Sequence, residues 1–173
     1  MTIQLGVTQD IDKLEALFDD LNDYLEENGN GAGWKKGIYP IREDAEKGIL
    51  NDELFVLRVE GQIAGSITLN HNQEVAYSQV DWNVQADGNQ VLVIRLLVVH
   101  PKFIRKGVSK ELLEFAKEHA RKLGCKSVRL DVANQNIPAC NLYEKAGFKY
   151  VKTVDLGLPY EHLKWFRLYE FVI

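Results

Sequence analysis

The chain has 173 residues, of which 46% are hydrophobic and 27% are charged, and its formal net charge is −4. This length and composition predict one globular domain, residues 1–173, with a sizeable core. The negative net charge argues against a general nucleic-acid binder, which needs a broad basic surface. No stretch reaches the roughly 18 apolar residues of a membrane-spanning helix, so we expect no membrane partner.

The two cysteines, Cys125 and Cys140, have no metal-ligand spacing, and no secretory signal stands near Ile3. We therefore expect reduced thiols, a cytoplasmic location and no metal site. The four histidines also lack the spacing typical of metal binding or nucleophilic catalysis.

The first 50 residues predict a strand and two helices. A short strand at 3–7 precedes apolar residues that keep helical spacing from Ile11 to Leu25, and Asn28-Gly29 ends that helix. Residues 30–40 are too glycine-rich for a long helix and read as a loop. A short helix is expected at 43–48.

The middle of the chain predicts a sheet. Strands at 54–59 and 62–69 meet across Glu60-Gly61, which is a hairpin signal. Residues 74–90 have few helix cues and are expected to form an irregular connection. The nearly continuous apolar run 91–99 predicts a strand that is buried on both faces.

The last third alternates helices with strands. Helices are expected at 109–123 and 138–146, and strands at 127–132, 148–154 and 165–172. The whole order is β, α, α, β, β, β, α, β, α, β, β. It predicts an α/β (α+β) domain with a mixed, mostly antiparallel twisted sheet flanked by helices.

Between the strand 91–99 and the next helix lies a basic loop with an anion-binding pattern. The first amides of a helix have no internal partner, and the helix dipole adds positive charge there. Gly107 lets a phosphate approach the backbone, and Ser109 is expected to be the N-cap. Arg105 and Lys106 supply charge at the rim, although such a loop can also be only a solvated turn.

A second motif follows the strand 127–132. Ala139 and Tyr143 follow Asn136 by three and seven residues, which places all three on one face of a helix that begins at Ile137-Pro138. Gly147 is expected to end this helix. The alternative interpretation makes Asn136 only an N-cap and Tyr143 a half-buried core residue.

Together these motifs resemble the GNAT superfamily of acetyl-CoA-dependent N-acetyltransferases. The resemblance rests on Leu97-Val98-Val99-His100-Pro101, Gly107-Val108-Ser109, Asn136-Ile137-Pro138-Ala139 and Leu142-Tyr143-Glu144-Lys145-Ala146-Gly147-Phe148. The family's loop motif has Gln or Arg first and Gly or Ala last, where this chain has Ile104 and Ser109. Because the family uses this loop mainly through backbone amides, the resemblance still implies cofactor binding.

The resemblance implies roles for both motifs. The pantetheine arm of acetyl-CoA would pair with the strand that ends at Val99, and the Leu97 amide would face the developing oxyanion. Tyr143 would donate a proton to the departing thiolate. The residues expected to contact the cofactor are Leu97, Val98, Val99, Ile104, Arg105, Lys106, Gly107, Val108, Ser109, Lys110, Asn136 and Tyr143.

The sequence gives less information about the residues that would bind the acceptor. Three carboxylates are candidates for the general base, and each could instead be a surface group or a strand-end cap: Glu74, Asp81 and Asp131. Four aromatic residues could form an acceptor wall or cover the core: Trp34, Tyr39, Tyr77 and Trp82. Arg95 could meet an acceptor carboxylate or lie at the surface.

The resemblance implies an N-acetyltransferase that moves an acetyl group directly to a primary amine of a small molecule, an amino acid or a peptide. The alternative is a non-catalytic acyl-CoA-binding sensor or scaffold, which Ile104 and Ser109 favour, whereas Asn136 and Tyr143 favour the enzyme. A phosphotransferase fits poorly because the Gly-Lys-Ser/Thr order is absent. A homodimer is one assembly left open.

Overall fold

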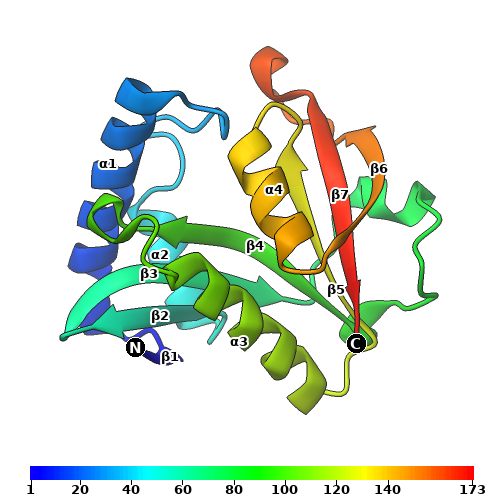
Figure 1. Ribbon diagram of the computed structural model, residues 1–173, viewed down its shortest axis with the longest axis horizontal. Helices are drawn as coiled ribbons and strands as arrows, with labels where there is room; N and C mark the ends of the chain where they lie inside the picture. Colours follow the sequence, from blue (N-terminus) through cyan, green and yellow to red (C-terminus); the bar gives the residue numbers. More distant parts are fainter. The chain divides into compact units, whose positions relative to one another are not determined.

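The protein is described here by a computed structural model that covers residues 1–173. The helices and strands follow the predicted order, and their bounds differ from the predicted ones by no more than three residues (Figure 1). The strand order is β1-β2-β3-β4-β5-β7-β6 in a seven-stranded sheet. This architecture confirms the predicted α/β class with a mixed, mostly antiparallel sheet.

The chain forms two compact units. Unit 1 comprises Met1–Asn30, Trp34–Leu69 and Arg95–Phe115, and unit 2 comprises Gly31–Gly33, Asn70–Ile94 and Ala116–Ile173. Strand β4 (Val91–Val99) and helix α3 (Val108–Lys122) contribute to both units.

Unit 1 is built on a meander of strands. β1 (Thr2–Leu5) pairs antiparallel with β2 (Leu54–Val59), and β2 pairs antiparallel with β3 (Gln62–Asn70). Glu60 and Gly61 have φ angles of 50° and 79°, which is the backbone twist that a tight hairpin requires. The predicted hairpin is therefore confirmed.

Two helices of unit 1 bury their apolar residues against this sheet. α1 (Ile11–Asn28) packs Leu14 and Phe18 into a core that includes Val56 of β2 and Val98 of β4. Ala45 of α2 (Arg42–Leu50) belongs to the same core. Trp34 and Tyr39 are partly buried against it, with their rings edge to face and 5.6 Å between centroids.

Unit 2 carries the other strands. Residues 91–94 of β4 pair in parallel with residues 127–130 of β5 (Ser127–Ala133). β7 (Trp165–Val172) lies antiparallel between β5 and β6 (Lys149–Asp155). Helix α4 (Ile137–Lys145) contacts β7 through Tyr143 and Glu144, which both lie near Tyr169.

The connection between β3 and β4 is irregular, as predicted, with two short 3₁₀ turns at Val75–Gln79 and Gly88–Gln90. Three of its apolar side chains are nevertheless buried: Tyr77, Val80 and Trp82 share a core cluster with Leu168 of β7. The connection is thus a packed part of unit 2. None of the helices has the length and apolar character needed to cross a membrane.

Candidate functional site

The loop that follows β4 is fixed at its start by His100. The His100 N–H donates to the Ala64 carbonyl at 2.9 Å, which ties the loop to β3. The Lys102 N–H donates to Nδ1 of the His100 ring at 3.2 Å, and Nε2 lies 3.3 Å from Oδ2 of Asp20. Burial lowers the pKa of His100, so near neutral pH the ring is neutral and Nδ1 can accept this bond.

Two residues in the turn into α3 have a left-handed backbone conformation. Arg105 has a φ of +62° and Gly107 a φ of +83°. The helix begins at Val108, and the Gly107 carbonyl accepts the Glu111 N–H at 3.1 Å. Gly107 is therefore the N-cap, and the predicted cap at Ser109 is wrong. The left-handed turn at Gly107 brings the chain into the helix two residues earlier than the serine suggested.

The start of α3 presents backbone donors. The N–H groups of residues 107–110 have no acceptor within the chain, whereas those of Ile104 and Lys106 bond to the carbonyls of Pro101 and Phe103. Three basic side chains of this segment, Arg105, Lys106 and Lys110, are exposed. A helix N-terminus with unsatisfied donors and exposed cations can hold a phosphate group.

Gly65 of β3 determines how closely α3 approaches the sheet. A Cβ atom at this position would lie 2.7 Å from the Val98 carbonyl oxygen and 2.9 Å from Cγ1 of Val108. The first turn of α3 therefore packs directly on β3 and β4. This contact fixes the direction in which the free amides of the helix point.

The second motif lies in unit 2, at the start of α4. Oδ1 of Asn136 accepts the Ala139 N–H at 3.3 Å, which confirms the N-cap interpretation. Gly31 lies so close that a Cβ there would be 3.0 Å from Cα of Asn136. A contact of Asn136 with a cofactor stays a prediction.

Tyr143 is more deeply buried than predicted, since only 8% of it is exposed. Its ring lies 6.1 Å from the ring of Tyr169 on β7. Burial, and then the negative charge of Asp131, raise the pKa of Tyr143 well above its ordinary value. The phenol therefore keeps its proton at neutral pH, which a proton donor requires.

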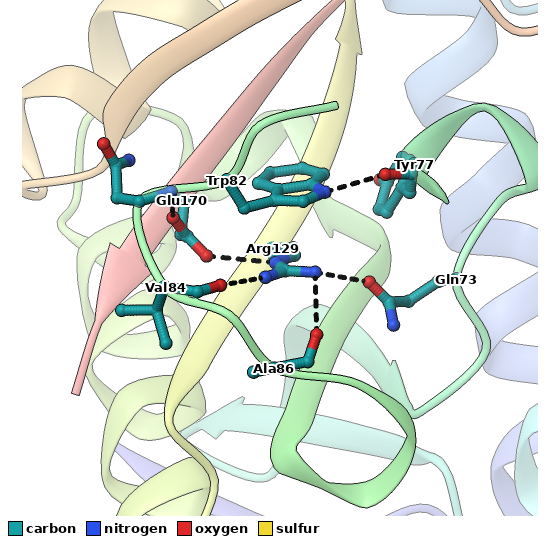
Figure 2. A network of polar contacts seen from close by, with 8 residues as sticks. Gln73, Tyr77, Trp82, Val84, Ala86, Arg129 and Glu170 are labelled. Carbon is teal, nitrogen blue, oxygen red and sulfur yellow. Dashed lines mark hydrogen bonds and ion pairs between the residues drawn. The ribbon is translucent and has the colours of Figure 1, made fainter. Parts of the chain in front are cut away.

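A buried arginine on β5 organises the β3–β4 connection (Figure 2). Nε of Arg129 donates to Glu170 Oε1 at 3.0 Å, and both side chains are almost completely buried. The guanidinium also donates to Gln73 Oε1 at 2.7 Å and to the Val84 carbonyl at 2.8 Å. One charged group thus binds the connection at several points to β5 and β7.

Trp82 lies on top of this arginine. Its ring centroid is 4.2 Å from Cζ of Arg129, and its Nε1–H donates to the Tyr77 carbonyl at 2.9 Å. The rings of Tyr77 and Trp82 are 5.1 Å apart. Both aromatics are buried, so the structure favours a core role for them over an acceptor wall.

The three candidate carboxylates have different surroundings. Oδ2 of Asp131 accepts the Tyr77 hydroxyl at 2.6 Å, and Asp131 is partly buried. Glu74 is also partly buried, whereas Asp81 is exposed. Asp131 is thus held by a hydrogen bond to a buried tyrosine.

Arg129 and Glu170 were not singled out from the sequence. The immediate neighbours of each are apolar or aromatic: Val128 and Leu130 flank Arg129, and Tyr169 and Phe171 flank Glu170. A charge in a buried stretch of strand is rarely tolerated without a partner, so two such charges of opposite sign predict a buried pair. That signal could have identified them.

Comparison with known proteins identifies the family. The model of the acetyltransferase (GNAT) family matches residues 14–148. Streptothricin acetyltransferase of Escherichia coli is 31% identical over 116 residues, which are 65% of this chain and 58% of that protein. Mycothiol acetyltransferase of Propionibacterium freudenreichii is 38% identical over 71 residues, 41% of this chain and 22% of that protein. The chain thus spans less than two thirds of these curated relatives.

Solved structures share the fold. A GNAT-family acetyltransferase from Streptococcus agalactiae has a TM-score of 0.83 at 19% identity, covering 99% of this chain and 95% of that one. A Bacillus anthracis structure described as a streptothricin acetyltransferase, in complex with acetyl coenzyme A, has a TM-score of 0.56 at 24% identity, covering 69% and 62%. The family match and this fold agree with the motifs on β4, α3 and α4. The chain therefore belongs to the GNAT family of acetyltransferases, a family that depends on acetyl-CoA.

Proposed function

We propose that the protein is an N-acetyltransferase that moves the acetyl group of acetyl-CoA directly to a primary amine of a small molecule. The observation that carries this proposal is the row of backbone amides at 107–110 without acceptors, at the start of a 15-residue helix in a chain of this family. The pyrophosphate of the cofactor is the anion that these donors suit.

The cofactor is held mainly by backbone groups in this proposal. The amides of 107–110 receive the pyrophosphate, and Arg105, Lys106 and Lys110 add positive charge. Neither Ile104 nor Ser109 weakens this binding, because a backbone N–H does not depend on the side chain. Pairing of β4 with β5 ends at Ile94, and β4 continues to Val99. The residues beyond the last pair offer backbone groups to the pantetheine arm and, at Leu97, to the oxyanion.

Tyr143 is the proposed general acid. When the thioester is broken, the sulfur leaves as a thiolate and needs a proton. Tyr143 keeps its proton at neutral pH because burial disfavours the phenolate. A buried phenol beside the sulfur would protonate the thiolate and prevent it from attacking the product.

The relatives support a small-molecule acceptor. Streptothricin and mycothiol acetyltransferases carry the names of small molecules, and the former is 31% identical over its matched region. An amino acid or a peptide amine is the second class. Its support is weaker, because the ribosomal-protein-alanine acetyltransferase structure from Brucella melitensis shares the fold at only 17% identity.

Calorimetry with acetyl-CoA, followed by an assay for thiol release with a panel of amines, tests the proposal. The panel contains streptothricin, free lysine and a peptide with an N-terminal alanine. We expect acetyl-CoA to bind and streptothricin or another small amine to release thiol. Binding without transfer to any amine would support the acyl-CoA-binding module instead. Absence of binding would contradict both functions.

A further inference from the structure

A histidine caps the first turn of the cofactor loop, the segment 100–107 that leads into α3. Nδ1 of His100 accepts the Lys102 N–H at 3.2 Å, and the His100 carbonyl accepts the Phe103 N–H at 2.8 Å. The ring is thus the N-cap of the 3₁₀ turn Pro101–Phe103, a role that Asn, Asp or Ser usually takes. Unlike these side chains, a histidine ring gains a proton within the physiological pH range.

The capped turn continues to the amides that are proposed to hold the pyrophosphate. The Ile104 N–H donates to the Pro101 carbonyl at 3.3 Å, and the Lys106 N–H donates to the Phe103 carbonyl at 3.2 Å. The next N–H along the chain, that of Gly107, is the first of the amides without an acceptor. The histidine cap and these amides therefore belong to one short hydrogen-bonded segment, and a change at its start is expected to move its end.

Asp20 of α1 determines which ring nitrogen of His100 accepts. Its Oδ2 lies 3.3 Å from Nε2, so the Nε2–H points to the carboxylate and the lone pair of the neutral ring is on Nδ1. Only 16% of the His100 side chain is exposed, which leaves the ring little room to turn away. Asp20, His100 and Lys102 all belong to unit 1. The carboxylate on one element thus fixes the cap on another.

The charged groups that face the His100 ring are Asp20 of α1 and Lys102 of the same turn, while β3 meets this residue through the Ala64 carbonyl. Burial lowers the pKa of His100 from its ordinary value of 6.5, Asp20 opposes this effect and Lys102 adds to it. The ring is therefore neutral near neutral pH. It gains its second proton only as the pH falls below 6.5, the value of an unperturbed histidine.

Protonation of the ring removes the cap. Both nitrogens of an imidazolium carry a hydrogen and donate, so Nδ1 no longer accepts. The Nδ1–H and the Lys102 N–H would then face each other across 3.2 Å, two donors in place of a hydrogen bond. The Lys102 N–H loses its acceptor, and the turn has to rearrange to satisfy it.

We propose that His100 is a positioning residue for acetyl-CoA: its neutral ring holds the cofactor loop in the form that binds the pyrophosphate, and protonation at Nδ1 releases that form. This inference rests on the proposed cofactor site at 107–110. Acetyl-CoA then prefers the protein with a neutral ring, so its affinity falls as the pH drops through the pKa of His100. By linkage, bound acetyl-CoA makes the ring harder to protonate.

Simple attraction between charges predicts the opposite sign. A cationic ring near a polyanionic ligand would strengthen binding at low pH, and the bound anion would raise the pKa of His100. Such attraction is screened beyond about 8 Å at 0.15 M ionic strength, whereas the loss of a hydrogen bond does not depend on salt. The direction of the pH effect, measured at this ionic strength, therefore distinguishes positioning from attraction.

The test is calorimetry of acetyl-CoA binding to the wild type, His100→Asn and His100→Ala at pH 7.5 and pH 5.5. Phosphate groups of the cofactor also titrate in this range, so each variant is compared with the wild type at the same pH. The Asn oxygen accepts the Lys102 N–H at both pH values. We expect the Kd of the wild type to rise about threefold more than that of His100→Asn. His100→Ala offers no acceptor and should bind more weakly than His100→Asn at both pH values.

Two aspartates of α1 form a matched pair of variants. Asp20→Asn keeps an oxygen that accepts the Nε2–H but removes a charge that favours the imidazolium, so the loss of affinity should move to lower pH. Asp23→Asn removes the same charge from the same helix, but Asp23 pairs with Lys36 at 2.7 Å. Its pH profile should match that of the wild type.

NMR titration of the His100 Cε1–H signal, identified by its loss in His100→Asn, gives a readout that is independent of turnover. We expect acetyl-CoA to lower the pKa of this ring. A raised pKa, or the same change of Kd with pH in the wild type and His100→Asn, would overturn the inference and leave the proposed function intact. Absence of acetyl-CoA binding to the wild type at pH 7.5 would defeat both, and it is distinct because the unmodified protein itself fails to bind.

Discussion

The Phe148 N–H donates to the carbonyl of Tyr143 at 3.0 Å, and the two rings meet edge to face with 6.0 Å between their centroids. Gly147, with a φ of +88°, makes the second bond of this helix end, from its N–H to the Glu144 carbonyl. The backbone and ring of Tyr143 are therefore fixed by the Schellman end of α4, before any ligand binds.

Tyr143→Phe should lower kcat about 100-fold while the Kd of acetyl-CoA changes less than about twofold, because only the transferable proton is removed. Steady-state kinetics and calorimetry measure the two quantities. Tyr169→Phe is the control: it removes a neighbouring phenol that donates to Glu144 at 2.8 Å, and it should lower stability by about 1 kcal/mol with little change in kcat. Unchanged turnover in Tyr143→Phe would contradict the acid role.

Gly107→Ala should weaken acetyl-CoA binding about 10-fold. A Cβ at a φ of +83° costs about 1–2 kcal/mol, and relief of that strain rotates the amides that begin α3. Gly88→Ala is a matched control, because Gly88 also has a positive φ and open space around its Cα but lies in the β3–β4 connection. It should lower the thermal midpoint without changing the Kd. Equal Kd values in the two variants would show that the amides do not bind the cofactor.

Arg129→Met should destabilise the fold by about 3–5 kcal/mol, because it leaves Glu170 buried and unpaired. Replacing both partners, as in Arg129→Met with Glu170→Leu, should recover most of this loss. Lys36→Met breaks the exposed pair with Asp23 and should leave stability almost unchanged, because solvent screens such a pair. Urea unfolding measures all three, and an equally severe loss in the double variant would indicate that the hydrogen bonds matter more than the buried charge.

Stability should fall as the pH drops below about 6.5. Burial lowers the native pKa of His100 and of His119 below their ordinary value of 6.5. The unfolded chain therefore binds protons first, so the full stability is present above 6.5 and is lost as the pH falls through the native pKa values.

His100→Asn separates the contribution of the cofactor loop from that of His119. The Asn oxygen can still accept the Lys102 N–H, but it cannot be protonated in this range. Unfolding free energies measured from pH 7.5 to 5.5 should fall less steeply in this variant. An unchanged slope would mean that His100 does not take part.

Local signals account for most of the fold. The apolar run 91–99, the Glu60-Gly61 turn and Gly147 each report a property of the backbone nearby, and the strand or turn that they predict is present. The prediction that Ser109 is the N-cap is wrong because the N-cap is the residue at which the chain enters the helix. The φ of Gly107 determines that point.

The acceptor side depends on contacts distant in sequence, which local patterns do not contain. From the sequence, Tyr77 and Trp82 could line a site or fill a core. The Trp82 ring packs on Arg129, which lies 47 residues later in the sequence, and this contact favours the core. The bond between Tyr77 and Asp131 spans 54 residues. Asp131 therefore could be proposed from the sequence only as one of three carboxylates.

The hydrogen bonds of Glu170 also determine when unit 2 can finish folding. Its Oε2 accepts the Asn83 N–H, a contact between residues 87 positions apart, and its Oε1 holds Arg129. The 73–86 segment can take its final position only after β7 has joined β5. On a ribosome this segment would wait for the synthesis of more than eighty further residues, and nascent chains that stop short of β7 should show it open to protease.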